Sequence, residues 1–181
     1  MFPSPIKKAE LCTVRAVLFF ENLLLTLLQG VLFRSPRKAP NRILVYKVGN
    51  IGDITCAIPS FMAIKKNYPN VHVALLTSPG ERNTIGAAEL LRGAWYLDEV
   101  KVYYPEDIDS LGKIMALAAS LRRERYDWFI HLPAHDWTSF ATMARNIIFA
   151  KLVGVRCAFG FRVRTIINLF RKTQIDYTTG R

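Results

Sequence analysis

The chain has 181 residues, of which 51% are hydrophobic and 22% charged; this excludes an intrinsically disordered protein and leaves room for one domain with an appendage. Its formal net charge of +11 lies at the two ends, because residues 1–40 carry +4, residues 41–144 carry 0 and residues 145–181 carry +7. Basic ends of this kind can contact phosphates of a nucleic acid, an anionic membrane or a phosphorylated glycan. The sequence has neither zinc-finger spacing nor an RNP-type signature, so we expect no nucleic-acid partner.

Residues 1–40 are predicted to form an apolar helix at residues 16–33 and a short linker. Such a helix is about 27 Å long, which is close to the thickness of a bilayer core. Asn22, Thr26 and Gln29 make a narrow polar stripe along it, and Glu21 adds a charge. Three interpretations remain open: a helix in the membrane interface, a helix docked on protein, and a single membrane span. The first would place the protein peripherally on the inner, cytoplasmic face of the cytoplasmic membrane.

Between residues 41 and 165, apolar strand-like runs alternate with helical segments. The expected strands are residues 43–47, 72–76, 99–103, 127–132 and 158–161. A first helix should extend to about residue 67, and further helices are expected at residues 81–92, 111–123 (with Ser110 as N-cap) and 138–152. This alternation predicts right-handed βαβ units and a doubly wound parallel sheet, which is a Rossmann-like α/β fold.

The loop at residues 48–53 follows the first strand and lies where ligands bind in such sheets. Gly49 and Gly52 permit a tight turn and close approach of a ligand to the backbone. Asp53 has two interpretations: an acid that stabilises the start of the helix, and a catalytic carboxylate. Lys47 is either an anchor for an anionic ligand or a strand-edge lysine that extends to solvent.

The stretch from Arg42 to Asn70 resembles the opening of glycosyltransferase family 9, the ADP-heptose:lipopolysaccharide heptosyltransferase family. That opening has a strand ending in a basic residue, a Gly-x-x-Gly-Asp turn, a proline six residues after the aspartate, and a Tyr-Pro pair. The matching residues here are Lys47, Gly49, Gly52, Asp53, Pro59, Tyr68 and Pro69. Further similar pieces extend the resemblance over residues 41–161; they are residues 97–100, 121–127, 152–155 and 160–161.

The resemblance implies the N-terminal, acceptor-binding domain of a GT-B glycosyltransferase, whose second Rossmann-like domain binds a nucleotide-sugar donor such as ADP-heptose. It implies that Asp53 is the general base of an inverting sugar transfer. Lys47, Gly49 and Gly52 would then contact the acceptor, which we expect to be a lipopolysaccharide-type or other lipid-linked glycan of a bacterium. No metal or other cofactor is expected.

Around the fourth strand the chain departs from the family pattern, because the acid and the glycine found there in typical heptosyltransferases are missing. His131 and His135 have the spacing of a metal site on a helix, but Pro133 between them and the strand context disfavour one. They are expected to contact the acceptor at the mouth of the pocket, or else to be ordinary loop histidines. Arg162 is either a contact for phosphates or acidic sugars, or part of a solvated basic tail.

The three cysteines give no sign of a disulfide or metal site. Cys12, Cys56 and Cys157 are far apart and form no CxxC motif. This pattern predicts neither a disulfide framework nor a structural zinc site, and it suits the reducing cytoplasm.

Residues 166–181 form a basic segment at about the place where the family's interdomain connection starts. We expect the donor domain to follow in the same gene or to be supplied by another chain, so that this chain alone would be inactive. Two other functions remain open: a nucleotide-binding Rossmann module and a non-enzymatic, membrane-tethered interaction domain. The nucleotide-binding module lacks support in two places, because the third glycine of GxGxxG is absent and no acid ends the second strand.

Overall fold

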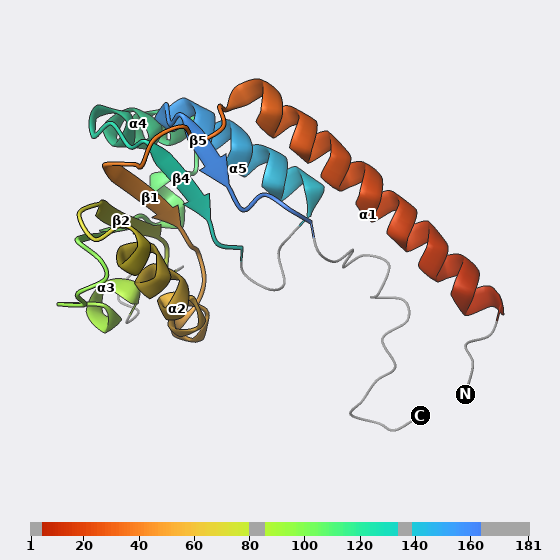
Figure 1. Cartoon of the computed structure of the whole chain (residues 1–181), viewed down its shortest axis with the longest axis horizontal. Coiled ribbons are helices and arrows are strands. Elements are labelled where there is room, and N and C mark those ends of the chain that lie inside the picture. Colours follow the sequence, from red (N-terminus) through yellow and green to blue (C-terminus); the bar gives the residue numbers. More distant parts are fainter. Residues whose placement is uncertain (1–4, 80–85, 134–138, 164–181) are drawn as a thin grey trace.

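The computed structural model describes residues 5–79, 86–133 and 139–163, which form an α/β fold around a single sheet (Figure 1). The sheet has five parallel strands in the order β3-β2-β1-β4-β5. This arrangement confirms the Rossmann-like class that the sequence predicts. The strands are β1 (Arg42–Tyr46), β2 (His72–Thr77), β3 (Glu99–Val102), β4 (Trp128–His131) and β5 (Cys157–Phe159).

Helices cover both faces of the sheet (Figure 1). Successive side chains of β1 point to opposite faces, so Ile43 and Val45 belong to one apolar core and Leu44 belongs to the other. The core with Ile43 is completed by α2 (Ile51–Asn67) and α3 (Ala87–Leu90). The core with Leu44 is completed by α1 (Pro5–Leu32), α4 (Leu111–Arg123) and α5 (Phe140–Val153). A 3-10 turn, η1 (Pro105–Asp107), precedes α4.

Several boundaries differ from the predicted ones. In the described part of the segment predicted as a helix at residues 81–92, the helix is limited to α3, and residues 81–85 lie outside the described residues. β5 starts one residue earlier than predicted and ends before Gly160, whose φ of 92° takes the chain out of the extended conformation. Pro59 lies inside α2 and does not begin it. Ser110 caps α4 as expected, since its side chain accepts a hydrogen bond from the backbone N–H of Lys113.

Helix α1 lies against α5 (Figure 1), and the side that carries Asn22 and Gln29 faces the domain. The side-chain amide of Asn22 donates to the carbonyl of Val163 (2.9 Å) and accepts from the backbone N–H of the same residue (3.0 Å). Gln29 donates to the carbonyl of Ala158 at 3.2 Å. Leu25, on the same side of the helix, is fully buried. Of the three interpretations of this helix, docking on protein therefore holds for the side that carries Asn22, Leu25 and Gln29.

The outward side of α1 is apolar. The window Arg15–Leu32 has a mean hydropathy of 1.5 and is long and apolar enough to cross a membrane, and only 6% of it is buried. By length and composition alone this is weak support for a membrane-spanning segment. The exposed apolar side chains of the helix are Val17, Phe19, Phe20, Leu23, Leu24, Leu27 and Val31.

Candidate functional site

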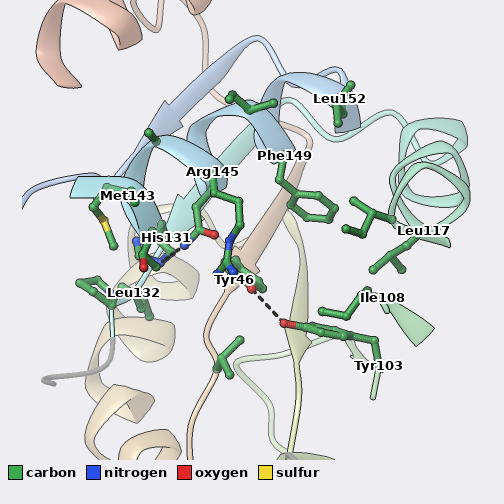
Figure 2. A pocket seen from close by; sticks show the side chains of 18 of the residues that line it. Tyr46, Tyr103, Ile108, Leu117, His131, Leu132, Met143, Arg145, Phe149 and Leu152 are labelled. Carbon is green, nitrogen blue, oxygen red and sulfur yellow. Dashed lines mark hydrogen bonds between the residues drawn. The ribbon is translucent and has the colours of Figure 1, made fainter. Parts of the chain in front are cut away.

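A cavity of about 920 Å³ lies at the carboxyl ends of β1 and β4, beneath α4 and α5 (Figure 2). Strands β1, β2 and β3 follow one another toward one edge of the sheet, whereas β4 and β5 lead to the other edge. The ends of β1 and β4 therefore form the point where the strand order reverses, and this is where open α/β sheets bind ligands. The volume is within the usual range of small-molecule sites, roughly 300–1,000 Å³.

Asp53 lies in the first turn of α2 and lines this cavity. Its Oδ2 accepts a hydrogen bond from the backbone N–H of Asn50 at 3.2 Å, so the residue stabilises the start of the helix. Its side chain is still 36% exposed, and Oδ1 lies 3.9 Å from the ammonium of Lys47 and accepts no hydrogen bond from the described residues. The two interpretations of Asp53 are thus compatible, because a first-turn acid can also present an oxygen to the cavity.

The glycines of this loop differ in their position. Gly49 lines the cavity beside Asp53 and adopts a φ of 151°. Gly52 belongs to α2 and is absent from the cavity lining, and a Cβ atom added to it would meet nothing within 4 Å. Gly49 therefore borders the cavity, whereas Gly52 does not.

Lys47 is buried beside the site, with only 6% of its side chain exposed. Its Nζ donates to the carbonyl of Pro133 at 3.3 Å and lies 3.9 Å from Oδ1 of Asp53. Burial lowers the pKa of the Lys47 ammonium, and the negative charge of Asp53 opposes this shift. Because Lys47 is buried, it does not extend to solvent, and it lies behind the residues that line the cavity. It supplies a positive charge next to Asp53.

His131 lines the cavity, but both of its ring nitrogens contact protein. Nδ1 lies 3.2 Å from the carbonyl of Gly160, and Nε2 lies 3.1 Å from the side-chain amide nitrogen of Asn146. A carbonyl can only accept, so Nδ1 carries the hydrogen and Nε2 accepts from Asn146. Burial lowers the pKa of His131 to about 4, which keeps the ring neutral, and the ring stacks on Phe161. Both ring nitrogens at the cavity wall are therefore already paired with protein atoms.

The remaining predicted site residues lie elsewhere. His135 is outside the described residues. Arg162 is exposed after β5 and is absent from the cavity lining. Within the described part of the chain, no group of three or more His, Cys, Asp or Glu side chains could hold a metal ion. Cys56 and Cys157 are free thiols.

Three cavity residues were missed by the sequence analysis. The hydroxyls of Tyr46 and Tyr103 lie 2.9 Å apart, and burial raises the pKa of both. Arg145 extends from α5 toward Tyr46 (Figure 2). Its positive charge opposes, without reversing, the rise in the pKa of both tyrosines, and it adds a little to the lowering of the pKa of His131 by burial. Tyr46 could have been found from the sequence, because it lies at the end of β1, where ligands bind. Arg145 could not, because the apolar residues around it in α5 indicate only a buried helix.

Most of the remaining cavity wall is apolar. It is built by side chains after β3, by one face of α4, and by the face of α5 that points toward α4 (Figure 2). The residues of α4 recur every three positions, which brings them onto a common face. These apolar residues include Ile108, Leu111, Ile114, Leu117, Ile148, Phe149 and Leu152.

Comparisons with known proteins identify a solved structure with a similar fold. No protein-family model matches the chain, and no curated protein matches it either. Among solved structures, the fold is similar to the crystal structure of the glycosyl transferase family 9 from Veillonella parvula DSM 2008, with 15% sequence identity and a TM-score of 0.48. The match covers 80% of this chain and 45% of that one, so this chain spans less than half the length of that protein.

Proposed function

We propose that this protein is the acceptor-binding part of an inverting glycosyltransferase, with Asp53 as the general base. The observation that carries the proposal is a partly exposed carboxylate at the rim of a large cavity, at the point of the sheet where ligands bind. The resemblance of the loop at residues 47–53 to family 9 supplies the reaction class. A nucleotide-binding Rossmann module is disfavoured by the absence of the glycine pattern that approaches a pyrophosphate.

The proposed reaction needs one proton acceptor and one departing group. The acceptor hydroxyl oxygen forms a bond to the anomeric carbon of the donor sugar as the bond from that carbon to the nucleoside diphosphate breaks. Oδ1 of Asp53 takes the hydroxyl proton during this step, and attack from the opposite face inverts the configuration. Oδ2 stays bonded to Asn50, which holds the carboxylate in one orientation.

The donor would be a nucleotide sugar, with ADP-heptose as the first candidate, and a second Rossmann-like domain would bind it. The acceptor would be a lipopolysaccharide-type or other lipid-linked glycan. The protein's own residues supply the base and the acceptor cavity, so no resident metal or cofactor is part of this mechanism.

We further propose that the protein binds the inner face of the cytoplasmic membrane through α1. The exposed apolar side of the helix and its basic neighbours, including Arg15, Arg34, Arg37 and Lys38, favour an anionic lipid surface. Replacing Phe20 and Leu24 with glutamate should abolish co-sedimentation with vesicles that contain anionic lipid. Replacing Leu90 of α3 and Met115 of α4, which are exposed and lie outside the cavity, in the same way is the control for lost surface hydrophobicity. Equal loss in both variants would argue against α1 as the anchor.

Glycosyl transfer is tested by comparing Asp53→Asn with Glu89→Gln at the native gene. Glu89 accepts a hydrogen bond from the backbone N–H of Gly86 at the start of α3, much as Asp53 does at α2, but it lies outside the cavity. Extracts are supplied with radiolabelled nucleotide sugars, and label in membrane glycolipid is measured. Asp53→Asn should lower transfer at least about 100-fold, and Glu89→Gln should leave it unchanged. Full transfer by Asp53→Asn removes Asp53 from the role of base.

A further inference from the structure

The cavity has two halves of different chemistry. Asp53, Arg145 and the paired hydroxyls of Tyr46 and Tyr103 lie at the sheet end of the cavity, where Figure 2 shows Arg145 and the tyrosine pair close together. The half between α4 and α5 is formed by hydrocarbon side chains. Figure 2 shows Leu117 and Phe149 there, together with Ile108 and Leu152.

An apolar wall of this extent does not suit a bare sugar. A sugar hydroxyl pressed against leucine and phenylalanine side chains loses its water partners and gains no hydrogen bond, which costs free energy. A hydrocarbon chain loses no hydrogen bonds in the same place, and it gains stability for every apolar surface that leaves water. The wall between α4 and α5 is therefore complementary to a hydrocarbon.

The charges of the other half favour an anion. Lys47 lies 3.9 Å from Asp53, so these two opposite charges largely offset each other. Among the described residues no carboxylate comes within salt-bridge distance of Arg145, although its guanidinium faces the cavity. A guanidinium beside two hydroxyls can bind a phosphate or carboxylate by several hydrogen bonds at once.

We propose that the cavity binds an anionic amphiphile, whose phosphate or carboxylate contacts Arg145 and whose hydrocarbon chain lies between α4 and α5. The inference deepens the proposed function and rests on it, because it assigns this amphiphile as the glycan acceptor. The apolar side of α1 belongs to the same layer of helices as α4 and α5. A lipid-linked acceptor drawn from a membrane is thus the source that the surroundings of the cavity favour.

Methionine methyl groups report this binding in the full chain. Met143 lines the cavity, Met62 lies in α2 on the opposite face of the sheet, and Met115 lies on the exposed side of α4. Protein labelled with ¹³C at the methionine methyls is titrated with decyl phosphate below its micelle concentration. The signal of Met143 should shift and saturate, while that of Met62 stays in place. Inorganic phosphate at the same concentrations should leave both signals unchanged.

Matched variants test each half of the cavity. Arg145→Gln should weaken decyl phosphate binding about 10-fold and leave neutral decyl glucoside unaffected, and Arg156→Gln, an exposed arginine outside the cavity, is the control. Leu117→Gln should weaken both probes about 10-fold, whereas Met115→Gln on the exposed side of the same helix should weaken neither. Thermal melts identify variants that fail to fold, and Leu152→Gln then replaces Leu117→Gln.

The outcomes separate this inference from the proposed function. A Met143 signal that ignores decyl phosphate, or an equal response to inorganic phosphate, overturns the amphiphile even where transfer depends on Asp53. Saturable binding together with full transfer by Asp53→Asn overturns the proposed base alone. Farnesyl phosphate is the second probe, and the tighter of the two compounds identifies an acyl-type or an isoprenoid-type chain.

Discussion

The carboxylate of Asp53 occupies the space that a side chain at Gly49 would need. A Cβ atom at residue 49 would lie 2.6 Å from Oδ2 of Asp53 and 2.7 Å from its Cβ, and the φ of 151° is itself one that L-residues rarely adopt. The glycine therefore fixes where the candidate base can lie. Residue 49 must therefore be glycine to leave room for the Asp53 carboxylate, and not only to let the loop turn.

Gly49→Ala should move the Asp53 side chain out of its present position. We expect transfer to fall to nearly the level of Asp53→Asn, with a loss of unfolding free energy of about 1 kcal/mol or more from the strained backbone. Transfer assays and urea denaturation measure the two effects. Wild-type transfer by Gly49→Ala would show that the carboxylate position seen here is not the active one.

The stability of the protein should decrease as the pH falls from about 6.5 toward 4. His131 has a folded-state pKa of about 4, below the 6.5 of an ordinary histidine, because burial penalises its charged form. Between these two values the unfolded chain binds the proton and the folded chain does not, so acid favours unfolding by an amount on the order of 3 kcal/mol at the lower end.

Urea denaturation between pH 4 and 7 measures this dependence. His131→Gln should be less stable at pH 7, since it loses the ring stacked on Phe161, but it should lack most of the dependence on pH. His72→Gln, which removes a partly exposed histidine of β2, should keep the dependence. An equal slope in wild type and His131→Gln would contradict the assignment.

Gly160→Ala should be strongly destabilising. A Cβ atom at residue 160 would overlap the carbonyl oxygen of His131, and the φ of 92° disfavours any side chain there. We expect a loss of more than about 2 kcal/mol, because both backbone strain and a backbone clash contribute. Gly112→Ala in α4 is the matched control, where a Cβ meets nothing within 4 Å, and it should be neutral or stabilising. Thermal melts of the two variants compare them directly.

Asn22→Ala should loosen α1 from the domain. The amide of Asn22 makes two hydrogen bonds to the backbone of Val163, and its loss leaves both backbone groups of that residue without these partners. The expected cost is about 1–3 kcal/mol. Thr26→Ala, which removes only a bond to a carbonyl of its own helix, should cost less. Hydrogen exchange at residue 163 should accelerate in Asn22→Ala alone.

The parallel sheet and the loop at residues 48–53 could be predicted because both depend on local patterns. The burial of Lys47 could not, since its partner Pro133 lies 86 residues further along the chain. Arg145 was missed because α5 carries apolar residues all around, between α1 on one side and α4 on the other, and thus shows no single polar face. The tyrosine pair could not be predicted either, because Tyr46 ends β1 and Tyr103 follows β3, and these two strands are not neighbours in the sheet.

The orientation of α1 was equally hidden from the sequence. A polar stripe on a helix usually faces water. Asn22 and Gln29 face the domain instead, because they donate hydrogen bonds to backbone carbonyls in and after β5. The partner of Asn22 is 141 residues away in the chain. A contact between residues so far apart in the chain leaves no pattern in the local sequence.

The inward hydrogen bonds of α1 also prevent the helix from rolling about its own axis. A loosely attached amphipathic helix could turn its apolar side inward in water and outward at a lipid surface. Here such a turn would break the bonds at Val163 and Ala158, so the folded protein keeps the apolar side of α1 outside. The protein is therefore expected to self-associate or require detergent when it is purified away from whatever surface covers that side.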